Sequence, residues 1–454
     1  MRPVVVIPVY KPEPSGAEAL ALRRCVDVLS AHRIVLVAPE DLPLGAYRRE
    51  AGRELPSERF AADFFAGIAG YNRLMTDPAF YRRFAAFDYM LVFQLDAWVF
   101  TDELMSWCAR GYDYVGAPWF EKFLSHEEGA GLWKCGNGGF SLRRIGRFLA
   151  ATESGLPRKL MDERKLWEDG CFAYGLDGTE WEMAKPDPLE AAGFSVEHSP
   201  AYLCERRGGR LPFGCHAWEH CQFFSFWRRF IPFAPERPRG GDVSLITEVG
   251  DDLAALQVTA DSLLTQSFRN FEWILCDRGA TPAVRAYVEQ VLAPYVVSGG
   301  LIDGDGLSAA NGRYVQLTAA GDAFCNHTAL AAIFGSERTA DVVHCEWVEP
   351  PRPDVYYDHS VRKSRPSVFF RTSLLRLTGL DRRLGRLAYW GAWRTLERIG
   401  ATFEHVETWA CSVRGERPPD PRERARREKA VRQIESPGLF ARLRFKWLRM
   451  RAFG

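Results

Sequence analysis

Short apolar runs alternate with amphipathic stretches along the first part of the chain. Val4–Val9, Ile34–Ala38 and Tyr89–Leu95 are almost continuously apolar and are bounded by charged or turn residues, which predicts strands buried on both faces of a sheet. Glu18–Ser30 and Phe64–Met75 have the apolar spacing of helices. This β-α-β order predicts parallel strands joined by a right-handed crossover, as in an α/β nucleotide-binding half-domain.

The pattern stops at residues 233–241, which have no periodicity and contain several Pro and Gly residues, so we expect a linker there. It then restarts with a predicted strand at Val243–Ile246, a helix at Leu253–Leu264 and a strand at Tyr314–Leu317. The predicted organisation is a first domain at 1–232, the linker at 233–241, a second domain at 242–412 and a charged helical tail at 413–454.

Composition and charge narrow the class of protein. A length of 454 residues predicts two or three domains. The net charge of +1, from 59 basic and 58 acidic residues, gives no overall field that would attract nucleic acid. The N-terminus resembles no secretory signal, and no apolar run is long enough to span a membrane, so we expect a cytoplasmic protein.

Asp96 follows the apolar run Tyr89–Leu95, where the predicted strand ends. Open α/β sheets bind their ligands outside the carboxyl ends of their strands. A carboxylate at that position can hold a cation beneath a diphosphate. The alternative is an aspartate that only caps a turn.

Three further segments carry candidate chemistry. The glycines of Gly136–Gly139 let a backbone approach a ligand closely, although such a segment is also common in plain turns. The acidic pair Glu168 and Asp169 lies among aromatic residues, where desolvation would raise a carboxyl pKa and suit a general base. The alternative for this pair is a solvated helix N-terminus. His216 lies between small and aromatic residues, and a histidine of this kind is more often a hydrogen-bonded core residue than a ligand.

Taken together, residues from about 1 to 232 resemble a bacterial family of glycosyltransferase-like proteins that carry the domain of unknown function 5672, within the GT-A fold. The stretches that carry the resemblance occur in order along the chain: Val6–Tyr10, Gly70–Met75, Gln94–Phe100, Gly116–Trp119, Gly136–Arg143 and Leu211–Trp218.

The resemblance implies roles for individual residues. GT-A enzymes share an acidic DxD pair, a Gly-rich acceptor loop, a late carboxylate and a late metal-binding His. The implied roles are catalysis for Asp169, Glu168 and Asp96; nucleotide binding for Pro8, Tyr10, Lys11, Asn72 and Arg73; acceptor binding for Asn137, Gly138 and Gly139; and metal binding for Asp96 and His216. The chain departs from the family at the second DxD acid, where it has Trp98. A divalent Mn²⁺ or Mg²⁺ would then have one protein carboxylate and His216, with phosphate and water as the other ligands.

Two stretches, Gln266–Trp273 and Gly306–Gly312, match the pattern of family 2 glycosyltransferases, so residues from about 242 to 410 resemble that family in a degenerate form. Where that family has an Asp-Ala-Asp-Asp motif, this chain has Ala319–Asp322, and where it has a late Glu-Asp pair, this chain has Ala388–Gly391. The resemblance implies a second GT-A-like domain that has lost its metal ligands and its base.

The main hypothesis from the sequence is a glycosyltransferase. It would move a sugar from a nucleotide-sugar donor to a surface polysaccharide or glycolipid precursor, with inversion and with Asp169 as the base. The alternative is a non-catalytic GT-A-shaped scaffold that binds glycans or a partner. A nucleotidyltransferase is disfavoured because no Lys/Arg-rich Gly loop lies near Tyr10.

The tail contains Leu443, Trp447 and Met450 at helical spacing, and Arg442–Arg451 includes five cations and no acid. Such a basic amphipathic helix can lie on an anionic membrane, with roughly 1 kcal/mol from each cation. The sequence therefore predicts peripheral contact with the inner membrane. The alternative is a helix that docks on the second domain through Leu443 and Trp447.

Overall fold

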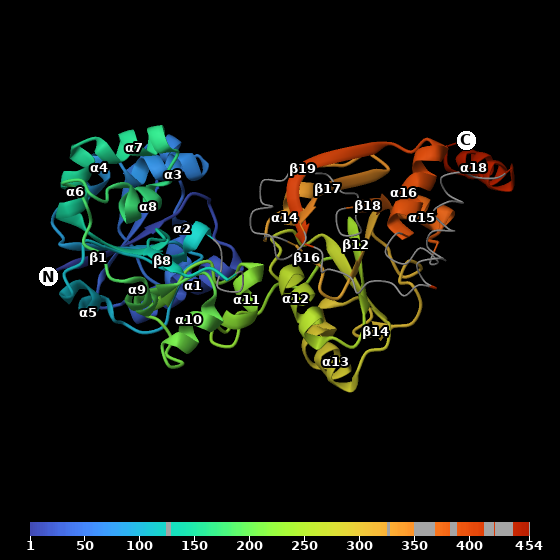
Figure 1. Ribbon diagram of the computed structural model, residues 1–454, viewed down its shortest axis with the longest axis horizontal. Helices are drawn as coiled ribbons and strands as arrows, with labels where there is room; N and C mark the ends of the chain where they lie inside the picture. Colours follow the sequence, from blue (N-terminus) through green and yellow to red (C-terminus); the bar gives the residue numbers. More distant parts are fainter. Residues whose placement is uncertain are drawn as a thin grey trace. The chain divides into compact units, whose positions relative to one another are not determined.

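The computed structural model describes residues 1–123, 129–324, 327–348, 368–381, 388–412, 422 and 439–453. The chain divides into two compact units: unit 1 is Met1–Glu219 with Phe226–Phe233, and unit 2 is His220–Ser225 with Ala234–Gly454. Each unit is an α/β structure that contains a mixed sheet, which confirms the predicted α/β class (Figure 1). Within the described ranges, no helix combines the length and the apolar character needed to cross a membrane.

Unit 1 contains eleven strands in the described residues. They are β1 (Pro3–Pro8), β2 (Arg33–Pro39), β3 (Ser57–Phe60), β4 (Tyr89–Phe93), β5 (Trp98–Val99), β6 (Tyr114–Val115), β7 (Pro118–Phe120), β8 (Leu132–Cys135), β9 (Phe140–Arg144), β10 (Ser195–Val196) and β11 (Gly214–Cys215). Its helices are α1 (Gly16–Val28), α2 (Gly45–Ala51), α3 (Gly67–Met75), α4 (Pro78–Arg83), α5 (Leu104–Ala109), α6 (Ile145–Glu153), α7 (Leu156–Arg164), α8 (Glu168–Gly170), α9 (Pro188–Phe194) and α10 (Pro200–Arg206).

The main sheet of unit 1 has the order β3-β2-β1-β4-β9-β6. The first four strands are parallel, and β9 is antiparallel to both of its neighbours. The prediction that the first strands are parallel is therefore confirmed. The chain builds outward from β1 to β3 and then returns to place β4 on the other side of β1, so the order reverses between β1 and β4. Crevices form at the carboxyl ends of strands at such a switch point.

The core of unit 1 follows the alternation of side chains along its strands. One face of the sheet, which includes Val4 and Val92, packs against α3, α4, α6 and α7 (Figure 1). Helix α1 begins with a capping box in which Ser15 accepts from the backbone of Glu18 and the Glu18 carboxylate accepts from the backbone of Ser15. The capping box fixes where α1 begins, a few residues beyond the end of β1.

One expected helix differs in the structure. The stretch predicted as a single helix at Phe64–Met75 is a 3-10 turn at Ala62–Phe65 followed by α3, which begins at Gly67. Gly67 has a φ of 67°. This left-handed conformation, which favours glycine, separates the two helical pieces.

A second, three-stranded sheet of unit 1 has the order β10-β11-β5. β5 and β11 are antiparallel, and Trp98 is paired with Cys215. β10 and β11 are parallel, and Val196 is paired with Cys215. The three strands of this small sheet are far apart in the sequence. Their pairing therefore brings the residues next to each strand close together.

Unit 2 has its own larger sheet, of order β14-β13-β12-β15-β18-β17-β19-β16. Its strands are β12 (Val243–Val249), β13 (Phe271–Asp277), β14 (Leu301–Ile302), β15 (Tyr314–Ala319), β16 (Ala323–Phe324), β17 (Val342–Val348), β18 (Val368–Arg371) and β19 (Phe403–Ser412). Its helices are α12 (Leu253–Leu264), α13 (Pro282–Tyr287), α14 (Ala329–Phe334), α15 (Thr372–Thr378), α16 (Ala388–Ile399) and α18 (Leu439–Phe453), and α11 (Cys221–Trp227) spans the division between the units.

Helices cover both faces of this second sheet. One core cluster joins the sheet to α12, α13 and α14, and a second joins it to α15, α16 and α18. Residues 232–240, which include most of the predicted linker, form neither helix nor strand.

Candidate functional site

The candidate site of unit 1 lies at the carboxyl ends of β1 and β4, where the strand order reverses. Tyr10 and Lys11 follow β1, and Asp96 follows β4. The charge of Asp96 acts on Tyr10: partial desolvation is the largest cause that raises the pKa of Tyr10, although 63% of the residue is exposed, and the carboxylates of Glu18 and Asp96 follow. Tyr10 and Asp96, at the ends of β1 and β4, therefore belong to one electrostatic neighbourhood.

Asp96 and His216 meet because β5 pairs with β11. The Oδ1 atom of Asp96 lies 3.2 Å from Nε2 of His216. The same ring nitrogen lies 3.1 Å from Oε1 of Gln94, and Nδ1 lies 3.4 Å from Oε1 of Glu197. Burial alone would lower the pKa of His216, but the carboxylates of Asp96 and Glu197 raise it well above its ordinary value. The imidazole is therefore charged between two acids.

The backbone of Gly138 and Gly139 lies between this pair and the acidic pair of α8. A Cβ atom on Gly139 would come within 1.9 Å of Nε2 of His216, and a Cβ on Gly138 within 2.4 Å of Oε1 of Glu168. Both positions exclude any side chain, so glycine is required here because of close packing on both sides.

The side chain of Asn137 holds the same loop in place through two hydrogen bonds. Its Oδ1 atom accepts from the backbone N–H of Gly139 at 2.9 Å, and its Nδ2 atom donates to Glu197 at 2.6 Å. The backbone of Gln94 donates to the carbonyl of Gly139 at 2.9 Å. The loop predicted to bind the acceptor is therefore tied to the residues around His216.

Asp169 lies on the other side of the loop, in the first turn of α8. Its carboxylate accepts from the backbone N–H of Gly138 at 3.3 Å and of Gly170 at 2.7 Å. Burial, followed by the charge of Glu168, raises the pKa of Asp169 to about 7. A carboxyl group with such a pKa is half ionised near neutral pH, which suits a general base.

Glu168 has a different role from its neighbour. Its Oε1 atom accepts from Nη2 of Arg143 at 3.0 Å, and both side chains are buried. The backbone N–H of Glu168 donates to Oδ1 of Asn72 at 3.1 Å. The guanidinium of Arg143 also donates to the hydroxyls of Tyr81 and Ser141. Glu168 is thus a buried ion-pair partner beneath the loop.

The five nucleotide-binding candidates fall into two groups. Pro8, Tyr10 and Lys11 lie at or just beyond the end of β1, on the side of Asp96. Asn72 lies on α3 and contacts Glu168, while Nη2 of Arg73 donates to the carbonyl of Asp63 at 2.8 Å. The side chain of Lys11 is 2.6 Å from the carboxylate of Glu18. The structure gives the positions and contacts of these five residues, and their nucleotide-binding roles stay predictions.

Three site residues have no counterpart in the sequence analysis. Glu197 lies just after β10 and contacts both Asn137 and His216, but no motif marks it. Glu219 has a pKa raised to about 8 by burial and by the charge of Asp96. Arg143 ends the Gly136–Arg143 stretch, but the resemblance implies no role for it, and its ion pair with Glu168 is known only from the fold.

The described residues do not make a metal site by themselves. No cluster of three or more His, Cys, Asp or Glu side chains suited to an ion occurs in the part of the chain that the structure describes. Asp96 and His216 could fill two positions only if His216 gave up its ring proton on metal binding, and their facing atoms are 3.2 Å apart. Trp98, at the place of the second DxD acid, is 4% exposed and packs edge-on against Trp218. Metal binding by Asp96 and His216 stays a prediction, and no chemical step below depends on it.

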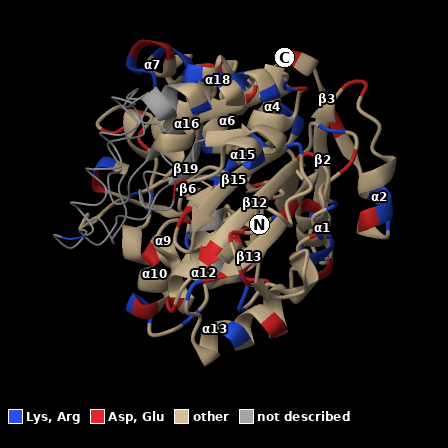
Figure 2. Cartoon of the chain, turned by 90° about the vertical axis from the view of Figure 1, so that its right-hand side faces the viewer, with Lys and Arg blue, Asp and Glu red and all other residues tan. Residues whose placement is uncertain are grey.

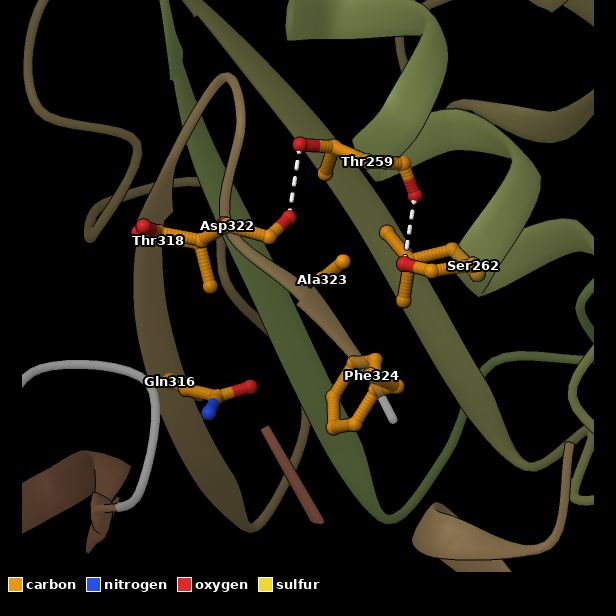
Figure 3. Close-up of a pocket in the computed structure, with 8 residues that line it drawn as sticks. Thr259, Ser262, Gln316, Thr318, Asp322, Ala323 and Phe324 are labelled. Atoms are coloured by element: carbon orange, nitrogen blue, oxygen red, sulfur yellow. Dashed lines mark hydrogen bonds between the residues drawn. The ribbon is translucent and has the colours of Figure 1, made fainter. Parts of the chain in front are cut away.

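In unit 2 the acid that follows β15 is buried. After β15, the carboxylate of Asp322 accepts from the backbone N–H of Ala319 at 2.8 Å, and Asp322 is 1% exposed. Next to it lies a small cavity lined by Thr259, Ser262, Leu263, Gln316, Thr318, Asp322, Ala323 and Phe324 (Figure 3). Its volume of about 10 Å³ is no larger than one water-sized sphere, so it cannot hold a nucleotide.

Comparison with protein families gives one match, which covers less than half of the chain. Residues 54–216 match the family described as "Protein of unknown function (DUF5672)". The matched DUF5672 region contains Asp96, the Gly138–Gly139 loop, Asp169 and His216. No curated protein matches the chain.

Several solved glycosyltransferase structures resemble parts of the chain weakly. S. aureus TarS in complex with UDP-GlcNAc has a TM-score of 0.35 and 14% identity, and the match covers 47% of this chain and 73% of that one. The mannosyltransferase PcManGT from Pyrobaculum calidifontis, with GDP-Man and Mn²⁺, has a TM-score of 0.32 and 18% identity over 59% of this chain and 88% of that one. GalNAc-T7 with UDP, GalNAc and Mn²⁺ has a TM-score of 0.31 and 10% identity over 46% and 56%. Scores of this size do not assign a function to the chain.

Proposed function

We propose that unit 1 is a GT-A-type glycosyltransferase that binds a nucleotide sugar at the carboxyl edge of its sheet. The observation that carries the proposal is the Gly138–Gly139 backbone, which has Asp169 on one side and the Asp96–His216 pair on the other. This assembly lies at the switch point between β1 and β4, where open α/β sheets bind ligands.

The donor would lie on the Asp96 side of the loop. Tyr10 is 63% exposed just beyond β1, so its ring is available to stack on a nucleobase. The acceptor would lie along the Asn137–Gly139 segment, within reach of Asp169. A glycan or a lipid-linked precursor fits this proposal because its reacting group is a hydroxyl.

The reaction would be a single displacement at the sugar's anomeric carbon. Asp169 would take the proton from the acceptor hydroxyl as the oxygen attacks. The new glycosidic C–O bond would form while the bond to the diphosphate breaks, and the nucleoside diphosphate would leave with that electron pair. One base and no protein nucleophile imply inversion of the anomeric configuration. Glu168, paired with Arg143, would position the loop without contacting the substrate.

A binding experiment tests the donor site. Isothermal titration of the full chain with UDP-, GDP-, CMP- and dTDP-sugars, each with and without Mn²⁺, should identify one nucleotide that binds. Asp169→Asn should keep this binding and lose transfer, because Asp169 would act only on the acceptor. Asp322→Asn, the matched control in unit 2, should keep both. If no nucleotide sugar binds under either condition, the proposal is wrong.

A non-catalytic glycan- or partner-binding scaffold is the second candidate, and one observation favours it. Trp98 occupies the core where the resemblance leads us to expect a second acid, so the Asp96 side has fewer acidic groups than the implied pattern. A scaffold could bind a sugar nucleotide or a glycan, but hydrolysis and transfer would be at background for both wild type and Asp169→Asn.

A further inference from the structure

Helix α18 presents an apolar stripe to solvent. Leu443, Trp447 and Met450 are 54%, 47% and 59% exposed. Their spacing of four and three residues places them on one side of the helix. Three large apolar side chains that adjoin one another on a surface mark an interaction site more often than isolated ones do.

The opposite side of the same helix is anchored to unit 2. Leu448 is 1% exposed and belongs to the core cluster that includes α15 and α16, and Phe445 and Ala452 pack against that cluster. Nη2 of Arg444 donates to the carbonyl of Thr378 at 3.2 Å. The sequence-based alternative that this helix docks on the second domain is therefore confirmed, but the residues expected to dock it are wrong: Leu443 and Trp447 are exposed, and Phe445, Leu448 and Ala452 form the docked side.

Cations flank the stripe. At 100° per residue, Arg444 and Arg451 lie on one side of it, and Lys446 and Arg449 lie on the other. All four side chains are exposed, and the guanidinium of Arg451 lies 5.2 Å from the ring centroid of Trp447. Leu439–Phe453 contains no Asp or Glu. Figure 2 shows its Lys and Arg residues as blue segments along α18.

We propose that α18 is a docking surface for an anionic lipid bilayer. The helix would lie in the plane of the membrane, with Leu443, Trp447 and Met450 in the boundary between headgroups and acyl chains and with the flanking cations at the lipid phosphates. Tryptophan favours this boundary because its ring is apolar and its N–H is polar. The occupant is a lipid surface because a second copy of the stripe would bring two sets of like charges together.

Lipid binding by α18 is independent of the proposed transfer reaction, since it is measured without a sugar nucleotide. The full chain is sedimented with vesicles made of equal parts phosphatidylglycerol and phosphatidylcholine, and separately with phosphatidylcholine alone. The wild type should pellet with the anionic vesicles at low salt and be released at high salt, because exposed charge attraction is screened. It should stay in solution with the neutral vesicles.

Two variants separate the parts of the surface. Leu443→Ser/Trp447→Ser/Met450→Ser should lower the partition constant by at least about tenfold, because the apolar insertion is lost. Lys446→Gln/Arg451→Gln should lower it and weaken its salt dependence. Val258→Ser is the matched control: it removes a 49% exposed apolar side chain from α12 of the same unit and should change nothing.

Folding of each variant is checked by thermal unfolding, which should match the wild type because all the changed side chains are exposed. Equal pelleting of the wild type and the triple variant, or no pelleting of the wild type with anionic vesicles, would overturn the proposal. A stripe-dependent dimer in light scattering without vesicle binding would also overturn it, and would identify a second copy as the occupant.

Discussion

The two units use the same strand arrangement but differ at the loop that follows their fourth core strand. Both sheets contain the same run of six strands, β3-β2-β1-β4-β9-β6 in unit 1 and β14-β13-β12-β15-β18-β17 in unit 2. In each run the first four strands are parallel and the next two pairings are antiparallel. After β4, Asp96 points to His216 with its side chain 30% exposed. After β15, Asp322 caps its own turn and is buried.

The topology that the two units share supplies a place for chemistry and not the chemistry itself. In unit 1 the acidic residue that follows the strand contacts His216, which comes from a distant segment of the chain. In unit 2 the corresponding acid satisfies a backbone N–H of its own turn. The turn after the strand therefore decides whether an acidic side chain at the switch point contacts other segments. That unit 2 has lost its metal ligands and its base stays a prediction.

The test with the largest expected effect replaces Asp169, which lies beside the Gly138–Gly139 loop of unit 1. Asp169→Asn should lower the transfer rate about 10²–10⁴-fold, because a general base contributes that much. Asp322→Asn should leave the rate unchanged, since Asp322 is buried in unit 2 and its carboxylate accepts from the backbone of its own turn. The measurement is product formation from the nucleotide sugar that calorimetry identifies. A large loss of rate in Asp322→Asn, with folding intact, would contradict the assignment of chemistry to unit 1 alone.

The second test compares one buried carboxylate in each unit, Glu168 in unit 1 and Glu272 in unit 2, and the groups that donate hydrogen bonds to it. Arg143→Met should destabilise unit 1 by about 3–5 kcal/mol, because it leaves the buried charge of Glu168 without its partner. In unit 2, Glu272 accepts from the hydroxyl of Ser244 and the backbone N–H of Gly312, so Glu272→Gln should cost less, about 1 kcal/mol.

Calorimetric unfolding of the full chain, with the two units as separate transitions, measures both effects. The double variant Arg143→Met/Glu168→Met is the control for charge, and it should recover part of the lost stability because no buried charge remains. Equal losses from Arg143→Met and the double variant would mean that packing, and not the ion pair, explains the effect.

The third test changes only volume at the glycine loop. Gly139→Ala should cost about 1–3 kcal/mol by overpacking against His216, where a Cβ would come within 1.9 Å of Nε2. Gly146→Ala is the matched control, because a Cβ there meets nothing within 4 Å and the residue lies in α6. That control should gain about 0.5–1 kcal/mol from helix propensity. Equal stability of the two variants in the same calorimetric assay would show that the loop can relax away from His216.

The smallest expected effect is a pH dependence of transfer. The base must be deprotonated, and the pKa of Asp169 is raised to about 7 by burial and by the charge of Glu168, with Glu197 adding to it. The rate should therefore fall as the pH drops through 7, and it should be about tenfold below its plateau at pH 6, one pH unit below that pKa. Initial rates measured at saturating donor across this range check the prediction. A rate that stays flat down to pH 5 would remove Asp169 from the role of base.

Local patterns predicted much of the fold. The buried strands near the N-terminus and their parallel pairing are present, because continuous apolar runs separated by an amphipathic helix leave few alternatives. The short strands β5, β10 and β11 were not predicted. Strands of two residues have no periodicity to detect, and they form only because long-range pairing stabilises them.

The main residues of the candidate site were predictable, and so was the closeness of Asp96 and His216, but the contacts that surround them were not. Asp96, Asp169 and His216 were found because each lies in a recognisable stretch. Glu197 was missed because its importance comes from the pairing of β10 with β11, which places it beside His216. The different roles of Glu168 and Asp169 could not be separated either, since only the fold decides which of two adjacent acids faces Arg143.

The pairing of β5 with β11 also has a consequence for how the protein folds. Gln94 and His216, which meet through it, are 122 positions apart in the chain. Closing so long a loop has an entropic cost that must be met before the contacts form, so contacts of high sequence separation form late. During synthesis, the main strands β1 to β4 can associate while His216 has not yet been translated. The side chains that we propose to carry the chemistry would then come together only after their supporting sheet is built.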